Sequence, residues 1–227
     1  MKILCTICMR SGSKGVKNKA YRKINGYPLF YYTLSVAQKS KIFDKIVIST
    51  DSEKIARMCE KYNANIFFLR SKKLAKDNTP KIDVIKDALL KAEKYYDKNF
   101  DCIFDLDITS PLRKISDLEN AFEIFKKNKS DNVFSITSSK KNPYFNVIEK
   151  KNKKVFLVKK SKLYFSRQKA PKVFDMNASI YIWRRNILLN NNSLFLKNTH
   201  TYEMPEERSI DIDTEFDFKV VKLLIEN

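Results

Sequence analysis

The sequence has little of several residue types, and each shortage narrows what the protein can be. It contains only one histidine, so chemistry built on several histidines is excluded. No apolar run approaches the ~20 residues that a membrane-spanning helix needs. The apolar run after Met1 is too short for a signal peptide, so we expect a cytoplasmic protein without a membrane partner. With 43% apolar residues the chain can form a core, which excludes wholesale disorder.

The four cysteines do not have the pattern of a disulfide set. Cys5 and Cys8 form a C-x-x-C, but residues three apart on a strand point to opposite faces. No second Cys/His pair completes a tetrahedral metal site. Cys59 and Cys102 have apolar neighbours and are typical of small core residues. We therefore expect no redox or metal role for these side chains.

Acidic charge is scarce relative to basic charge, and the formal net charge is +19. Such a balance is compatible with nucleic acid, membranes or anionic small molecules as partners. The lysines are spread along the whole chain, however, with Asp and Glu between them, and there is no basic tail. We interpret most of this charge as a solvated surface and expect no nucleic-acid partner. A non-catalytic anion or nucleic-acid binder remains as an alternative.

Strand-like and helix-like segments alternate along the first 138 residues. The apolar patterns predict strands at 2–8, 45–50, 65–70, 101–107 and 131–137, and helices at 28–40, 51–62, 80–96 and 114–128. This alternation predicts an α/β fold with a mostly parallel sheet covered by helices on both faces. Ligands in such folds bind beyond the carboxyl ends of the strands.

The pattern changes after residue 138. Residues 141–180 are hairpin-like and contain no long helical pattern, so we expect an inserted arm there. Residues 176–183 then predict a strand that returns to the sheet, and the chain ends in a predicted helix. The resulting division has 1–140 and 177–227 as the α/β domain, and 141–176 as the arm.

Two of the chain's three glycines, Gly12 and Gly15, fall in one cationic loop directly after the first predicted strand. Glycine permits close backbone approach, and the neighbouring Arg10, Lys14 and Lys17 can donate to phosphate oxygens. The loop matches neither the Walker nor the Rossmann glycine pattern. Its composition alone is compatible with a phosphate-binding loop or with an ordinary solvated turn.

Two pairs of alternating aspartates are candidate cation sites. Asp211 and Asp213 would point the same way in an extended segment and could share one Mg²⁺ with substrate phosphates. They could equally cap the final helix. Asp105 and Asp107 follow the central predicted strand and could face the same metal, or could simply end a strand before the turn at Pro111.

Seven short motifs occur in one order along nearly the whole chain: "CMRSGSKGVKNK", "VISTDSEKIA", "LAKDNTP", "TSPLR", "SRQKAP", "NASIYI" and "SIDIDTEFDF". Together they resemble the cytidylyltransferases that activate sialic-acid-type sugars, although each motif alone is weak. Within that family the chain is most similar to the bacterial enzymes that activate legionaminic acid and related nine-carbon sugars.

The resemblance implies a Rossmann-like nucleotidyltransferase fold and a homodimer whose arm reaches the partner's active site. The implied reaction joins CTP to a nine-carbon 2-keto sugar acid and releases pyrophosphate, with Mg²⁺ as cofactor. The product would serve a bacterial surface glycan.

The resemblance also implies roles for individual residues. The implied catalytic residues are Arg10, Lys17, Asp211 and Asp213, of which Asp211 and Asp213 would hold the metal. The implied nucleotide-binding residues are Arg10, Ser11, Gly12, Lys14, Lys17, Asn18, Arg70, Asp77 and Thr79. The implied sugar-binding residues are Asp107, Thr109, Ser110, Arg113, Arg167, Gln168 and Asn177.

The sequence departs from this family at two positions. Sialic-acid synthetases commonly have glutamine where Asp107 stands, and small polar residues are usual at Lys81. A carboxylate at position 107 would repel a sugar carboxylate unless a cation or lysine intervenes. These changes leave open a nucleotidyltransferase for another pair of substrates, such as GTP and an amino sugar.

Two further points are left open by the sequence. The aromatic segment 142–146 could contact sugar from the partner chain or form part of a dimer core. His200 lies outside every motif, so either Asp211 or a metal-bound water could accept the proton of the attacking hydroxyl.

Overall fold

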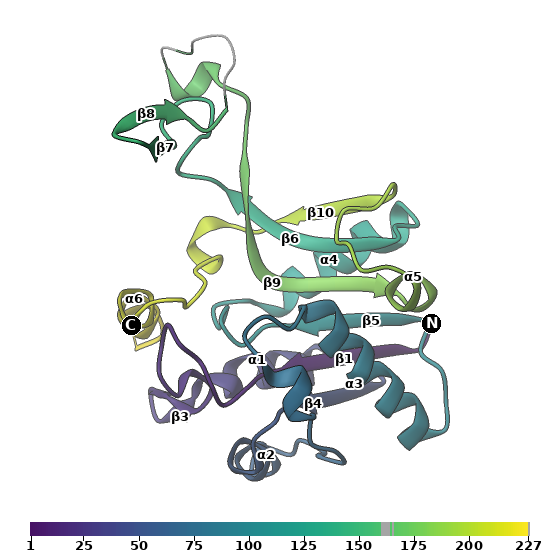
Figure 1. Ribbon diagram of the computed structural model, residues 1–227. Helices are drawn as coiled ribbons and strands as arrows, with labels where there is room; N and C mark the ends of the chain where they lie inside the picture. The colour runs from purple at the N-terminus through teal and green to yellow at the C-terminus, as the bar shows by residue number, and fades with distance from the viewer. Residues whose placement is uncertain (160–163, 165, 227) are drawn as a thin grey trace.

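A computed structural model of the chain describes residues 1–159, 164 and 166–226, and a twisted sheet forms its centre (Figure 1). The strand order within these residues is β10-β6-β9-β5-β1-β4. The bounds are β1 Ile3–Cys8, β4 Lys45–Ser49, β5 Cys102–Leu106, β6 Asn132–Ser138, β9 Phe174–Arg184 and β10 Thr199–Glu203. β9 runs antiparallel to both of its neighbours, and the other pairs are parallel. The predicted mostly parallel α/β fold is confirmed.

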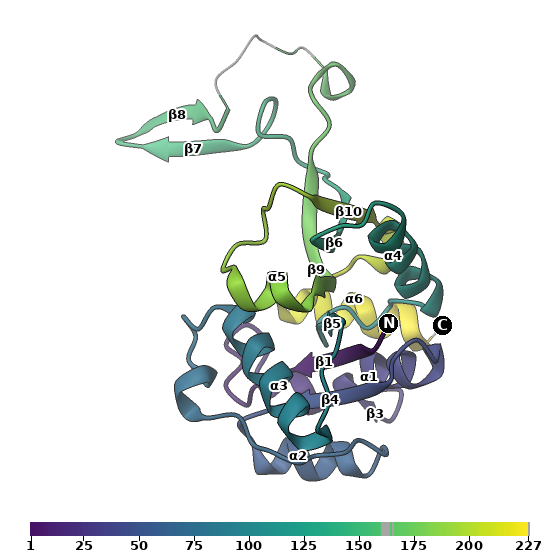
Figure 2. The same cartoon turned by 90° about the vertical axis from the view of Figure 1, so that its right-hand side faces the viewer.

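Helices cover both faces of the sheet (Figure 2). Their bounds are α1 Leu29–Ser40, α2 Glu53–Glu60, α3 Lys81–Tyr96, α4 Ile115–Lys127, α5 Arg185–Asn190 and α6 Glu215–Glu226. Apolar residues of α1, α2 and α4 pack on one face of the sheet, and those of α3 and α5 pack on the other. Cys5 belongs to the first of these clusters and Cys8 packs against the second, as strand geometry predicts.

The register of the central strands brings three loops together at one edge. Cys8 at the end of β1 pairs with Ser49 at the end of β4, and Thr6 lies opposite Asp105 of β5. The segments that follow these parallel strands, 9–18, 50–52 and 107–113, therefore meet at the carboxyl edge of the sheet.

Parts of the fold differ from the sequence prediction. Residues 65–70 were predicted as a strand but form none, because Phe67 and Phe68 turn into the core beside α3 instead of extending the sheet. The backbone of this segment reaches β4 through the Arg70 amide, which donates to the Thr50 carbonyl at 2.8 Å. The short helix α5 and the edge strand β10 were not predicted.

The predicted hairpin is confirmed as a projection from the main body (Figures 1 and 2). It consists of β7 Ile148–Lys151 and β8 Lys154–Leu157, paired antiparallel. Its turn contains Asn152 at φ 49° and Lys153 at φ 65°, as a tight two-residue turn requires. Residues 160–163 and 165 of the predicted arm lie outside the described residues, and the arm's bounds as a domain remain a prediction.

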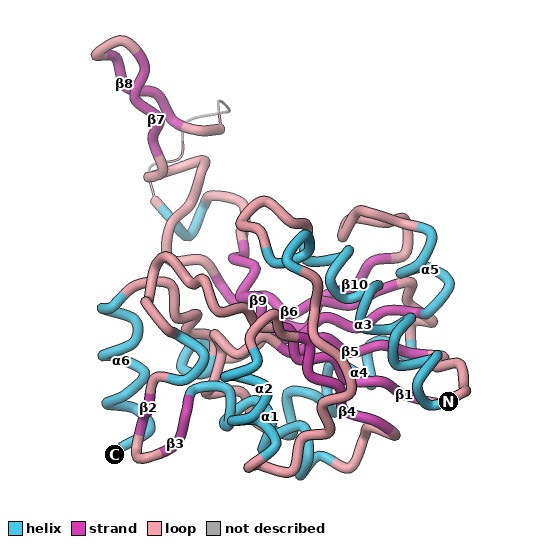
Figure 3. The backbone as a smooth tube through the Cα atoms, turned by 60° about the horizontal axis from the view of Figure 1, so that its bottom comes forward, coloured by secondary structure: helices cyan, strands magenta, loops and turns pink. Residues whose placement is uncertain are grey.

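A small third cluster anchors the carboxyl-terminal segment beside the opening loop (Figure 3). It joins α6 to a two-stranded ribbon formed by β2 Lys23–Ile24 and β3 Tyr27–Pro28. Val16 of the opening loop and Ile212 of the acidic segment are both fully buried in this cluster. None of the helices in the described part of the chain has the length and apolar character of a membrane span.

Candidate active site

The carboxyl edge of the sheet holds a cavity of about 380 Å³. Its lining comes from the opening loop, the segment before α3, the turn after β5 and the acidic segment before α6. The lining residues are Cys8, Met9, Arg10, Ser13, Lys14, Gly15, Lys19, Arg70, Leu74, Lys76, Asp77, Thr79, Lys81, Val84, Asp107, Ile108, Thr109 and Asp213. The cavity is therefore rich in cations, with carboxylates on two sides.

The cations of the opening loop are held by one aspartate across the cavity. Arg10 and Lys14 both form ion pairs with the Asp77 carboxylate. Hydrogen bonds hold the pKa of Asp77 below its ordinary value, the one from Lys14 having the larger effect and the one from Arg10 the smaller. Because these side chains are largely solvent-exposed, the pairs add little stability, and a stronger anion such as a phosphate can replace Asp77 as their partner.

The opening loop also touches the acidic segment directly. A Cβ atom at Gly15 would collide with the backbone oxygen of Asp213, so the close approach requires glycine here. Lys19 donates to the carbonyl of Ile212, and its Nζ lies 3.5 Å from Asp213 Oδ1. These contacts hold the cationic loop and the acidic segment side by side.

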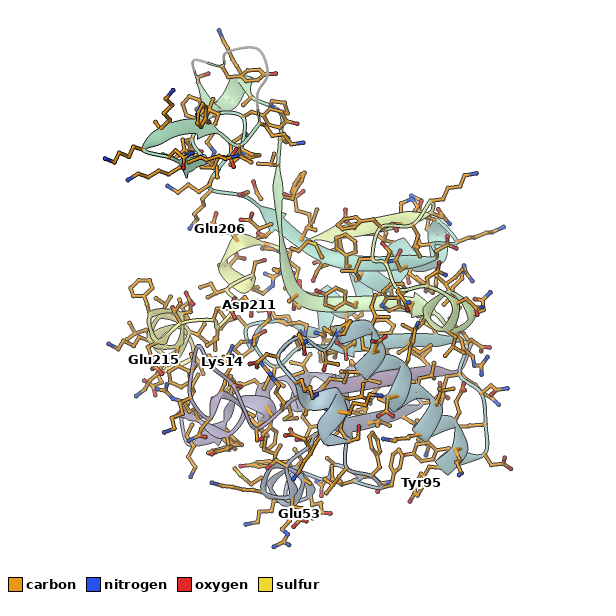
Figure 4. The ribbon with its side chains drawn as sticks, viewed as in Figure 1. Lys14, Glu53, Tyr95, Glu206, Asp211 and Glu215 are labelled. Atoms are coloured by element: carbon orange, nitrogen blue, oxygen red, sulfur yellow. The ribbon has the colours of Figure 1, made fainter. Side chains whose placement is uncertain are left out.

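The acidic segment leaves its two aspartates available for a ligand. Ile212 is fully buried, and its amide donates to the Thr109 carbonyl at 2.9 Å. The cap of α6 is made by Thr214 and Asp217, since the Asp217 amide donates to Thr214 Oγ1 at 3.2 Å and Thr214 donates to the Asp217 carboxylate. The carboxylates of Asp211 and Asp213 are therefore not needed to cap the helix. In Figure 4, Asp211 and Lys14 both lie at the edge of the sheet that faces α6.

The two aspartates fit a divalent cation. Burial, together with the nearby charges of Asp107 and Asp213, raises the pKa of Asp211 to about 6, although a hydrogen bond from Thr109 acts in the opposite direction. Asp211 Oδ1 is buried and has no hydrogen-bond partner among the described residues. No cluster of three or more His, Cys, Asp or Glu ligands occurs in that part of the chain, so further ligands would come from substrate phosphates and water.

The second aspartate pair faces a lysine. Lys81 Nζ, at the first residue of α3, lies 2.6 Å from Asp107 Oδ2 and 3.0 Å from Asp105 Oδ2. Thr6 Oγ1 donates to the other Asp105 oxygen at 2.7 Å. Burial lowers the pKa of Lys81, but the two carboxylates outweigh it and hold the pKa well above its ordinary value. Burial likewise raises the pKa of Asp107, and Lys81 more than reverses this shift.

A buried network beneath the cavity supports its floor. Arg113 donates to the Asp107 carbonyl at 3.1 Å and to Thr33 Oγ1 at 2.9 Å. Ser110 donates to the Asn177 carbonyl at 3.1 Å, and three of the seven predicted sugar-binding residues, Ser110, Arg113 and Asn177, are buried. Ser110 and Arg113 hold the turn after β5, the Asn177 side chain bonds to Ser135 and Ser209, and none of the three lines the cavity.

A second cavity of about 330 Å³ shares part of its wall with the first. It is mostly apolar and is lined by Pro80, Lys81, Ile82, Ile85, Tyr181, Trp183, Asn192, Ser193, Leu194 and Phe195. The indole N–H of Trp183 is buried there without a hydrogen-bond partner in the described part of the chain. Lys81 belongs to both walls and stands between the two cavities.

The structure brings most of the predicted site together, but not all of it. Arg10, Lys14, Arg70, Asp77, Thr79, Asp107, Thr109 and Asp213 line the main cavity. Four predicted residues of the opening loop lie outside that lining: Ser11, Gly12, Lys17 and Asn18. Asp211 also lies outside it, but it is hydrogen-bonded to Thr109, which is part of the lining. Arg167 and Gln168 line a separate cavity at the base of the arm, where Arg167 donates to the Ser139 carbonyl at 2.7 Å.

Sequence reasoning did not select three of the lining cations. Lys19 ends the cationic motif of the opening loop but was not selected as a site residue. Lys76 stood among many other lysines with no distinguishing signal, and Lys81 was noted only as a departure from a family pattern. Their positions depend on which distant segments meet at the edge of the sheet, and a local pattern does not contain that information.

Comparisons with known proteins agree with this geometry. The family model described as cytidylyltransferase matches residues 4–225. The chain is 49% identical to post-translational flagellin modification protein B of Campylobacter coli and 48% identical to CMP-N,N'-diacetyllegionaminic acid synthase of Campylobacter jejuni, in each case over 99% of this chain and 95% of the relative. A solved CMP:2-keto-3-deoxy-manno-octonic acid synthetase in complex with CTP has the same fold, with a TM-score of 0.73, 15% identity and 100% and 99% coverage of the two chains. The chain therefore belongs to the cytidylyltransferase family of nucleotidyltransferases.

Proposed function

We propose that this enzyme joins CTP to a nine-carbon 2-keto sugar acid, of the legionaminic type, to give the CMP-sugar and pyrophosphate. The observation that carries the proposal is the pairing of a cationic loop with an acidic segment around one cavity at the carboxyl edge of the sheet. The identity of the sugar rests on the 48% identity to the C. jejuni legionaminate enzyme across nearly both chains.

The reaction needs the anomeric hydroxyl of the sugar to attack the α-phosphate of CTP while pyrophosphate leaves. Negative charge then builds on the phosphate oxygens, and Arg10 and Lys14 can exchange Asp77 for the triphosphate to neutralise that charge. Lys19, held against the acidic segment, adds a third cation. Holding both reactants in one cavity supplies much of the remaining rate enhancement.

We further propose Mg²⁺ as the divalent cation, held by Asp211 and Asp213. The buried oxygen of Asp211 and the excess of carboxylate charge around it support this assignment. The ion would neutralise phosphate charge and lower the pKa of the attacking hydroxyl.

We propose that the sugar lies across Lys81, between the two cavities. A sugar whose anomeric oxygen attacks the α-phosphate must adjoin the nucleotide, and the apolar cavity is the neighbouring space. Its apolar walls suit acyl groups of the sugar.

A homodimer is also part of the proposal. The arm carries solvent-exposed Ile148 and Val155 on a projecting hairpin, which a second copy could cover. Arg167 and Gln168, which lie away from this chain's main cavity, would then approach the partner's sugar site. We assign the reaction to the cytoplasm, because the four cysteines are all free, as in proteins of a reducing compartment.

Pyrophosphate release tests the proposed function. The assay combines each of the four nucleoside triphosphates and Mg²⁺ with one of five sugars. They are N-acetylneuraminic acid, legionaminic acid, pseudaminic acid, a 3-deoxy-octulosonate and a simple amino sugar. We expect release with CTP and legionaminic acid above the other pairs. Release with GTP and an amino sugar, and none with CTP, would instead support the alternative pair of substrates.

A further inference from the structure

Lys81 is held in a cluster to which the reaction described above assigns no chemical step. Its ammonium contacts both Asp105 and Asp107 and lies 4.8 Å from the ring centre of Tyr181. Both of the positions at which the sequence departs from the sialic-acid pattern, Lys81 and Asp107, thus form one ion pair. The charge of Asp107 is thus compensated by that of Lys81.

Loss of Lys81 from this cluster would destabilise the fold. Asp105 is fully buried, and a buried carboxylate is strongly unfavourable without a partner. Lys81 is the first residue of α3, where the positive end of the helix dipole disfavours a cation. Nothing in helix formation favours lysine at this position, so the two carboxylates, not the helix, account for it.

The charge balance argues against a role for Lys81 in binding triphosphate. Two carboxylates already neutralise this ammonium, whereas Arg10 and Lys14 share one exposed aspartate that a phosphate can replace. A lysine ammonium carries three hydrogens, and the two aspartates use at most two of them. The third remains for a ligand at the boundary of the two cavities, where Lys81 lines both walls.

We propose that Lys81 and Asp107 form a selectivity pair for the sugar acid. The Lys81 ammonium donates to an oxygen of the sugar, and the Asp107 carboxylate accepts from an adjacent hydroxyl or amide N–H of the same sugar. A sugar that places an acceptor oxygen at Lys81 and a donor group at Asp107 is favoured over a sugar that lacks this arrangement. The inference rests on the proposed function and names the residues that choose among its substrates.

The test compares Lys81→Met, Asp107→Asn and the double variant with wild type, using legionaminic and N-acetylneuraminic acids as the two sugars. Asp107→Asn keeps the Lys81–Asp105 ion pair, so it retains the fold even if Lys81→Met is unstable. The matched control is Lys91→Met on the same helix. Lys91 pairs with Asp87 at 2.8 Å, its side chain is 35% exposed against 32% for Lys81, and its Nζ lies 4.6 Å from the ring centre of Phe68.

We expect Lys81→Met to raise the KM for legionaminic acid about tenfold or more, because a charge-assisted hydrogen bond is lost, while the KM for CTP changes less than about threefold. The ratio of kcat/KM for the two sugars shifts about fivefold or more in Lys81→Met and in Asp107→Asn. The double variant shifts it no further than either single change, because the two residues act as one unit. Lys91→Met leaves the ratio and both KM values unchanged.

A ratio within about twofold of wild type in both single variants would overturn the inference and leave Lys81 as a structural ion pair. Equal increases in the KM values for CTP and sugar would also overturn it. Wild-type enzyme that releases pyrophosphate with none of the sugars would overturn the proposed function, and this inference with it. If wild type turns over the sugars but both single variants keep its ratio of kcat/KM for the two sugars, the inference is refuted and the proposed function stands.

Discussion

Among single residues, Gly15 and Asp213 decide whether the opening loop and the acidic segment share one cavity. Gly12 and Gly15 looked alike in the sequence, as two glycines in a cationic loop. In the structure only Gly15 faces another segment, since a Cβ atom at Gly12 would meet nothing within 4 Å. Long-range contact, rather than loop composition, makes one of these glycines necessary.

Gly15→Ala should push the opening loop away from Asp213. The added methyl has no room, so we expect a loss of about 1–3 kcal/mol in the free energy of unfolding, as for other overpacked sites. Thermal denaturation of Gly15→Ala and Gly12→Ala measures the difference. The account expects Tm to fall only in the first variant, and equal Tm values in both would contradict it.

Asp213→Asn should remove one of the two proposed metal ligands without harming the fold, because the Asp213 side chain is 76% exposed. We expect Tm within about 2 °C of wild type and a fall in metal-dependent turnover of roughly a hundredfold or more. Glu53→Gln serves as control, since Glu53 pairs only with exposed Arg57 in the described contacts. Near-normal turnover by Asp213→Asn would remove this residue from the site.

The sequence locates candidate site residues where they belong to a local pattern. The loop after β1 and the alternating aspartates before α6 were both found in this way. The buried partners of Arg113, and the pairing of Lys81 with Asp105, come from contacts between segments far apart in the chain. A single sequence carries no local signal for such contacts.

Among the elements, the strands with apolar residues throughout were predicted and the atypical ones were not. β10 reads "THTYE" and pairs only at the edge of the sheet, so its one buried residue, Tyr202, gives no alternating pattern. Residues 65–70 have the composition of a strand, yet they pack across the edge beside β4. Composition favours extended backbone, but it does not determine whether a pairing edge is available.

The start of α4 is joined to the turn that precedes the acidic segment. Arg208 donates to both oxygens of the buried Asp117, at 2.9 and 3.0 Å, and Tyr202 donates to the same carboxylate at 2.8 Å. Burial raises the pKa of Asp117, but these bonds and the Lys114 amide hold it below its ordinary value. The carboxylate therefore stabilises the fold when it is ionised.

Asp117→Asn should lower the free energy of unfolding by about 3 kcal/mol at pH 7, because a buried charged partner of Arg208 is lost. The folded-state pKa lies below the unfolded value, so this stabilisation is present above about pH 4 and is lost as the pH falls through the folded pKa. Urea denaturation at pH 7 and at pH 3.5 measures the difference in the free energy of unfolding between wild type and Asp117→Asn. A difference that does not shrink at the lower pH would contradict the ionised pair.

The whole molecule has a compact α/β body and a projecting arm, and we propose that a second copy covers the arm (Figure 1). Val155→Asp on the arm should weaken the dimer, because it places a charge on an apolar surface that the partner buries. Leu223→Asp is the matched control, since Leu223 on α6 is 62% exposed and Val155 is 61% exposed. Light scattering should find more monomer only for Val155→Asp, and a strictly monomeric wild type would contradict the proposed dimer.

The central claim is that this chain forms a phosphodiester bond between CMP and a nine-carbon sugar acid. Phosphorus NMR of a reaction with CTP, legionaminic acid and Mg²⁺ tests it most directly, because every phosphorus product is seen at once. The account predicts one equivalent of pyrophosphate and one CMP-sugar phosphodiester for each CTP consumed. Unchanged CTP in the presence of the sugar, or its hydrolysis to free CMP alone, would contradict it.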